Sequence, residues 1–108
     1  MNMSEYQRKA MRTKGNYATT EEQILNASLG LAGEVGECVD LIKRVVFHGH
    51  KLDKEYIKKE LGDIAWYIAL MSDALGLDMS DICRENITKL EKRYPNGFDK
   101  ELSQNRQE

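Results

Sequence analysis

Apolar side chains recur every three or four residues along most of the chain, the spacing that places them on one face of an α-helix. No stretch alternates apolar and polar residues over the length of a strand, so the pattern predicts an all-α fold. The periodicity covers about residues 20–47, 54–75 and 79–94, and a shorter polar helix is expected over residues 4–12. We therefore expect a small bundle of three amphipathic helices preceded by a short one.

Capping residues mark the ends of the predicted helices. Thr19, followed by Glu22 three positions later, matches the capping-box pattern for the start of the first long helix. Asp53 and Asp78 are suited to begin the second and third long helices. Gly76 is placed to end the second helix in a left-handed conformation. These local signals divide the chain into separate helices before any packing is considered.

The length of the chain limits it to one domain. With 108 residues, 41% of them hydrophobic, there is room for a single core, so we expect one domain over residues 1–108. Its last part, about residues 99–108, is a polar tail that either frays or docks through Phe98 and Leu102.

Charge and composition exclude several classes of partner. The 16 Lys and Arg residues are balanced by 18 Asp and Glu, a net charge of −2, so neither nucleic acid nor an anionic membrane is an expected partner. The longest apolar run, residues 64–71, is far shorter than the roughly 20 residues that a membrane span needs. There is no apolar signal segment, and Cys38 and Cys83 are interpreted as buried free thiols, so we expect a cytoplasmic protein.

Two of the predicted helices carry the same acidic pattern. At about 100° per residue, Glu34 falls inside the apolar arc of the first long helix and Glu37 falls just outside it. Glu60 and Asp63 take the same two positions on the next helix. Two such helices joined by a short connection are expected to form an antiparallel hairpin. The expected core stripes are Leu31, Val35, Cys38, Ile42, Val45 and Val46 on the first helix, and Ile57, Leu61, Ile64, Ile68, Met71 and Leu75 on the second.

A hairpin of this kind brings four carboxylates together. Like charges within about 4–6 Å raise one another's pKa, and partial burial increases the cost. A divalent cation removes this repulsion, and an all-carboxylate site is typical of hard ions such as Mg²⁺, with Mn²⁺ as a substitute. The alternative is that the acidic pairs are solvated helix faces.

The third long helix carries a complementary polar flank. Asn86, Lys89 and Arg93 lie together beside its apolar stripe. An amide and two cations next to a carboxylate-bound metal indicate a polyphosphate ligand, whose charge both would neutralise. The alternative is that the two cations only favour the C-terminal end of their helix. The apolar stripe itself comprises Met79, Cys83, Ile87, Leu90 and Tyr94.

Glycines interrupt the first long helix. Gly30, Gly33 and Gly36 each cost about 1 kcal/mol relative to alanine in a helix interior. Their spacing predicts the close approach of another backbone, and the alternative is a bend or break near residues 30–33.

Three segments together resemble a known family. GLAGEVGECVDLIKRV, KKELGDIAWYIALM and ENITKLEKRYPNGF are similar to the MazG-type all-α nucleoside triphosphate pyrophosphohydrolases, especially their short phage and bacterial members. The resemblance covers roughly residues 5–100. The core motif of the family, Glu-x-x-Glu, a spacer and Glu-x-x-Asp, corresponds here to Glu34, Glu37, Glu60 and Asp63.

The resemblance implies an activity and a role for each candidate residue. It implies Mg²⁺-dependent hydrolysis of the α–β phosphoanhydride of a nucleotide, giving a monophosphate and pyrophosphate. The four acidic residues would be metal ligands, and one of the glutamates would orient or deprotonate the attacking water. Asn86, Lys89 and Arg93 would contact the nucleotide or its phosphates. Gly33 departs from the pattern, because many members carry a glutamate there, so the number of bound metals stays open.

The resemblance also implies a homodimer or homotetramer. This agrees with the residue pattern, since three amphipathic helices in so small a domain leave an apolar face for a partner. Three other functions stay open at this point. They are a phosphoribosyl-ATP pyrophosphohydrolase of the same superfamily, a non-catalytic helical interaction module, and a metal-buffering or di-iron protein, which the lack of a Glu-x-x-His pair disfavours. The base and sugar preference cannot be derived from the pattern.

Overall fold

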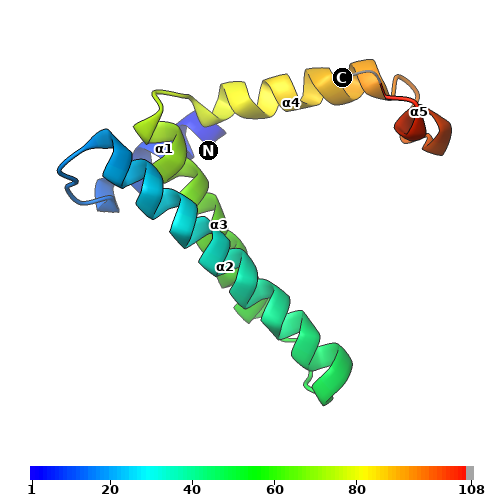
Figure 1. The fold of residues 1–108 in the computed structure, drawn as a ribbon, viewed down its shortest axis with the longest axis horizontal. Coiled ribbons are helices and arrows are strands. Elements are labelled where there is room, and N and C mark those ends of the chain that lie inside the picture. Colours follow the sequence, from blue (N-terminus) through cyan, green and yellow to red (C-terminus); the bar gives the residue numbers. More distant parts are fainter. Residues whose placement is uncertain (107–108) are drawn as a thin grey trace.

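The computed structural model describes residues 1–106 of the chain and shows helices joined by short connections (Figure 1). No strand occurs within those residues, so the all-α prediction is confirmed. No helix within them is both long and apolar enough to cross a bilayer. The elements in chain order are α1 (Met3–Ala10), the 3₁₀ turn η1 (Met11–Thr13), α2 (Thr20–His48), α3 (Lys54–Ala74), α4 (Met79–Arg93) and α5 (Lys100–Gln104).

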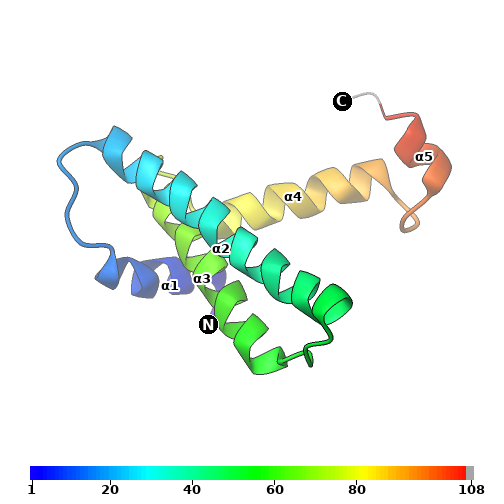
Figure 2. The ribbon, with the colours of Figure 1, turned by 60° about the horizontal axis from the view of Figure 1, so that its bottom comes forward.

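The long helices α2 and α3 lie side by side as an antiparallel hairpin, as predicted (Figure 1, Figure 2). The predicted caps are present: the side chain of Thr19 accepts a hydrogen bond from the N–H of Glu22, and Asp53 accepts one from Tyr56. Gly49 ends α2 with a positive φ of 70°, a conformation that favours glycine. Local sequence therefore explains where both helices begin and where the first one ends.

A contact with an aromatic ring explains one of the three glycines. A Cβ atom on Gly30 would lie 2.1 Å from Cε1 of Tyr67, so only glycine allows this approach of α2 and α3. It is the ring of Tyr67, not another backbone, that comes close. Added Cβ atoms on Gly33 and Gly36 would meet nothing within 4 Å. Since α2 is continuous through all three positions, the predicted alternative of a break does not occur.

The core of the single chain is small. Its buried apolar residues are Ala27, Ala69, Leu70 and Met79. The radius of gyration is 17.1 Å, whereas about 13 Å is expected for a compact domain of this length. The elements are therefore arranged as an open assembly with much apolar surface exposed.

The predicted core stripes of the hairpin are partly wrong for the single chain. Val46 is 64% exposed on α2, and Leu61 is 54% exposed on α3. The apolar arc of each helix is wider than one neighbouring helix can cover. The contact between α2 and α3 covers the side of each arc on which Glu34 and Glu60 lie. Glu60 is accordingly buried, with 7% of its surface exposed, while part of the apolar arc faces outward.

Helix α1 fastens the turn between α3 and α4. The N–H and the hydroxyl of Ser4 both donate to Oγ of Ser80, at 2.9 and 2.7 Å. The amide of Gln7 donates to the carbonyl of Leu77 and accepts from the N–H of Met79 at 2.7 Å. These bonds join segments at least 70 positions apart and determine the direction in which α4 leaves the hairpin.

Helix α4 extends away from the hairpin as an arm, and α5 lies near its far end (Figure 1, Figure 2). Its apolar stripe is largely exposed, with Ile87 53% and Leu90 37% accessible. Cys83 is also exposed, so its predicted burial is wrong for the single chain.

The predicted tail is ordered as far as it is described. Residues 100–104 form α5, and Phe98 lies 5.4 Å from Tyr94 between ring centroids. Residues 107–108, the end of the predicted tail, lie outside the described residues.

Candidate functional site

Three of the predicted acidic residues come together where α2 and α3 face each other. One carboxylate oxygen from each of Glu34, Glu37 and Glu60 lies within 4.8 Å of the other two. Glu60 is buried, Glu34 is partly buried and Glu37 is exposed, so the group opens to solvent on one side. We call these three residues the acidic cluster.

Two oxygens of the acidic cluster have no partner in the described structure. Oε2 of Glu34 and Oε2 of Glu60 are inaccessible to solvent, and no amide, hydroxyl or cationic group in the described structure donates a hydrogen bond to either of them. Unpaired buried carboxylate oxygens are costly, because their hydration is lost without replacement. A hard divalent cation, which takes oxygen ligands, would satisfy both atoms. The residues present therefore fit a bound divalent cation.

The electrostatics of the cluster follow from its composition. The pKa of Glu60 is raised, chiefly by hydrogen bonding with Glu34, with burial and the charges of Glu34 and Asp63 adding to the effect. The pKa of Glu37 is also raised, chiefly by hydrogen bonding with Glu60 and by the negative charge of Glu60. Neighbouring carboxylates can share hydrogen bonds only when one of them holds a proton. Without a cation, the site therefore retains protons that isolated glutamates would release.

Asp63, the fourth predicted acidic residue, is not one of the three whose carboxylate oxygens lie within 4.8 Å of one another, so the predicted group of four is reduced to three in the single chain. It is exposed, and its charge contributes to the raised pKa values of both Glu37 and Glu60. Burial, and to a smaller extent the charge of Asp63, raises the pKa of Tyr6 on α1. Asp63 is thus electrostatically coupled to the cluster.

The predicted polar flank of α4 is not beside the acidic cluster in the single chain. Lys89 and Arg93 line a different site, a pocket of about 660 Å³ between α4 and α5. Asn86 lies on the same helix, which packs against α1 and extends away from the hairpin. The helical periodicity of the sequence correctly placed these residues on one helix. The prediction that they lie next to the carboxylates is wrong for the single chain.

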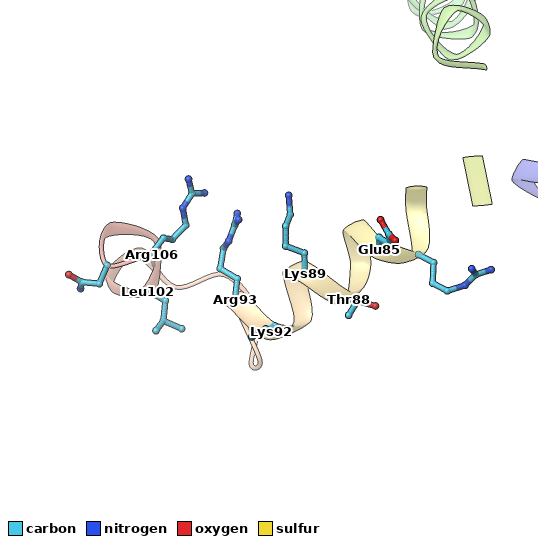
Figure 3. Close-up of a pocket in the computed structure, with 9 residues that line it drawn as sticks. Glu85, Thr88, Lys89, Lys92, Arg93, Leu102 and Arg106 are labelled. Carbon is cyan, nitrogen blue, oxygen red and sulfur yellow. The ribbon is translucent and has the colours of Figure 1, made fainter. Parts of the chain in front are cut away.

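The pocket between α4 and α5 is also lined by an arginine that was not predicted from the sequence as a site residue (Figure 3). Arg106, which follows α5, lines it together with Lys89 and Arg93. No periodic pattern connects the tail with α4, so only the fold brings these residues together.

A second polar site joins the same two long helices. Oδ2 of Asp73 accepts hydrogen bonds from Nζ of Lys14 at 2.8 Å and from Nε2 of Gln23 at 2.9 Å. Both bonds lower the pKa of Asp73. Nearby, the indole of Trp66 donates to the carbonyl of Ala10 at 3.1 Å. Trp66 therefore packs against the end of α1 and η1, and its indole also donates to the hydroxyl of Thr13 at 3.0 Å.

Comparison with known proteins agrees with this geometry. A family model described as the MazG nucleotide pyrophosphohydrolase domain matches residues 22–98, which include the acidic cluster and α4 but not α5. The Gene 37 protein of Mycobacterium phage L5 is 28% identical over 80 residues, and the alignment covers 70% of each chain. No solved structure matches the chain at a significant level.

Proposed function

Since the chain belongs to the MazG nucleotide pyrophosphohydrolase family, we propose that it cleaves the α–β phosphoanhydride of (d)NTPs, releasing a monophosphate and pyrophosphate. The observation that carries the proposal is the acidic cluster, with its two unpartnered carboxylate oxygens. The role would be control of the nucleotide pool by one cytoplasmic domain.

The four acidic residues would hold the metal ion, Mg²⁺ or in its place Mn²⁺. Glu34 and Glu60 would direct their unpartnered oxygens to it, and Glu37 and Asp63 would complete the open side. When bound, the cation supplies Lewis-acid polarisation of a phosphoryl oxygen. Glu37, the exposed member of the cluster, is accessible to water and is suited to orient it or to accept its proton.

The polar residues of α4 would bind the nucleotide. Asn86, Lys89 and Arg93 offer an amide and two cations, which suit phosphate oxygens in the transition state. Because α4 of one chain extends away from its own acidic cluster, we propose that α4 of a second copy completes the site. The protein would then act as a homodimer or homotetramer.

The exposed apolar surface supports this assembly. Val39, Val46 and Phe47 on α2 are each at least 62% exposed. On α4, Ile87 and Leu90 are accessible along the predicted core stripe. Contiguous apolar faces of this kind are typical of protein interfaces. Light scattering tests the proposal directly: a dimeric or tetrameric mass supports it, and a monomer contradicts it.

The activity is tested by incubating the purified protein with NTPs, dNTPs and phosphoribosyl-ATP, with Mg²⁺ or with EDTA. Chromatography of the products identifies which bond is cleaved. Mg²⁺-dependent release of pyrophosphate from a triphosphate supports the proposal and ranks the substrates. Cleavage of phosphoribosyl-ATP alone would assign the histidine-pathway reaction of the same superfamily. No turnover of any substrate would contradict the proposal and favour an interaction module.

A further inference from the structure

We infer that the C-terminal segment formed by α5 and Arg106 is the second wall of a polyphosphate-binding pocket on α4, with Arg106 as a further substrate-binding residue. The segment lies beyond residue 98, where the match to the family ends. The choice of a nucleotide as the natural ligand rests on the proposed function. The pocket itself rests on geometry and charge.

The pocket is lined by side chains of α4, of α5 and of the residues that follow α5. Its volume of about 660 Å³ lies within the usual range of small-molecule sites, about 300–1,000 Å³. Lys89 and Arg93 contribute from α4, and Leu102 and Arg106 from α5 and the residues that follow it. In Figure 3 the side chains of Lys89, Arg93 and Arg106 extend from the ribbon in the same direction. The tail therefore extends the row of cations that begins on α4.

The charge of the pocket favours an anionic ligand. Among the described residues that line it, five are Arg or Lys and one, Glu85, is acidic. Arg84 is ion-paired with Asp81, but no ion pair in the described part of the chain involves Lys89. Several guanidinium and ammonium groups lining one pocket give it a positive potential that attracts anions. Phosphate groups match guanidinium donors especially well, because two parallel hydrogen bonds can form.

The spacing of the cations favours a chain of linked phosphates. Lys89 and Arg93 are one helical turn apart, about 6 Å along the axis, and Arg106 follows from a different element. Such a row is too long for one phosphoryl group and suits a polyphosphate. Nucleic acid is disfavoured, because the chain as a whole carries a net charge of −2.

Inorganic triphosphate in EDTA is the probe that tests the pocket without metal and without hydrolysis. Isothermal titration should show that the wild-type protein binds it and that Arg106→Gln binds it about tenfold more weakly, the loss expected for one charge-assisted hydrogen bond. Lys100→Gln is the matched control: it removes one positive charge from α5 at a position that does not line the pocket, and should change the Kd by less than about twofold. Arg106→Lys should restore part of the affinity.

Three results would overturn the inference. They are equal affinities of Arg106→Gln and Lys100→Gln, no binding of triphosphate by the wild type, and tighter binding of a single-stranded oligonucleotide than of triphosphate.

Steady-state kinetics separate this inference from the proposed function. If the wild type hydrolyses nucleotides, Arg106→Gln should raise KM about tenfold with kcat unchanged, as expected for loss of substrate binding alone. Hydrolysis with an unchanged KM in Arg106→Gln would overturn the inference and leave the proposed function standing. Arg106-dependent binding of triphosphate by a protein without hydrolytic activity would support the pocket and contradict the proposed function.

Discussion

Two acidic residues on α3, Asp73 and Glu60, face the same neighbouring helix in opposite electrostatic settings. Asp73 accepts hydrogen bonds from Lys14 and Gln23, and its pKa is lowered. Glu60 is surrounded by other carboxylates, its pKa is raised, and one of its oxygens has no partner. Both belong to the hairpin, and both are removed in part or in full from solvent.

The difference separates a structural group from a functional one. At Asp73 the chain supplies its own cation, Lys14, so the polar site is complete within one molecule. At Glu60 the neighbouring groups, Glu34 and Glu37, repeat its charge. Such a cluster is stable only with retained protons or with an external cation. The repulsion that weakens the metal-free hairpin is what would make it bind a metal.

The largest expected effect is a loss of activity when Glu60, and not Asp73, is neutralised. Glu60→Gln keeps the size of the side chain but removes the charge of a proposed metal ligand, so hydrolysis should fall by at least about 100-fold. Glu55→Gln, at an exposed position in the first turn of α3, is the control and should retain activity. Pyrophosphate release measures both. Activity of Glu60→Gln within a few-fold of the wild type would remove Glu60 from the proposed ligands.

A change between the two sites should disturb both of them. Gly30→Ala would place a Cβ atom 2.1 Å from the ring of Tyr67, so the ring or the helix that carries it must shift. We expect a loss of about 3 kcal/mol in the free energy of unfolding, the upper range for overpacking. Gly33→Ala meets nothing within 4 Å and should instead stabilise the helix by about 1 kcal/mol. Chemical denaturation measures the free energy of unfolding of both variants. Equal stabilities of Gly30→Ala and Gly33→Ala would contradict the prediction.

Neutralising the structural acid should affect stability and not chemistry. Asp73→Asn loses the ion pair with Lys14 but can still accept a hydrogen bond from Gln23, so we expect a destabilisation of about 1 kcal/mol. Its kcat should equal that of the wild type at a temperature where both are folded. A large fall in kcat would show that the two sites are not separable.

The two acids should also respond to pH in opposite directions. The raised pKa of Glu60 means that the folded metal-free protein holds a proton more tightly than the unfolded chain, so this group favours unfolding at neutral pH. Stability should therefore rise as the pH falls through that pKa toward 4.5, the ordinary value. The lowered pKa of Asp73 stabilises the fold above 3.8, and this contribution is lost as the pH falls through the folded value.

Thermal unfolding in EDTA across this pH range tests both signs. Glu60→Gln should be more stable than the wild type at pH 7, with the advantage disappearing near pH 4.5. The deficit of Asp73→Asn should persist at pH 4.5 and shrink only at lower pH. An advantage of Glu60→Gln that stayed constant with pH would contradict the assigned repulsion.

Much of the hairpin could be predicted from local sequence. Caps such as Thr19 and Asp53 act through their own side chains within a few residues, and they start the helices as expected. The acidic cluster follows from helical geometry alone, because Glu34 and Glu60 take matching positions on two antiparallel neighbours. Both features depend on short-range rules and on one short connection.

The placement of α4 could not be predicted in this way. Its direction depends on bonds from Ser4 and Gln7 to the turn before it, which join distant parts of the chain. The periodicity of the sequence gives the face of the helix on which Lys89 lies, but it does not give the direction of that helix in the fold. The same limit applies to Arg106, since no periodicity relates the tail to α4, and to Gly30, whose partner is a ring on another helix.

The central claim, that the acidic cluster is completed by a divalent cation, is tested most directly by thermal unfolding with and without Mg²⁺ in the absence of nucleotide. Binding to the folded state alone stabilises the wild type by about 2.7 kcal/mol at a Mg²⁺ concentration 100 times the Kd. The account predicts a rise in Tm for the wild type and for Asp73→Asn, and little or none for Glu60→Gln. An equal rise in all three proteins, or no rise in the wild type, would contradict it.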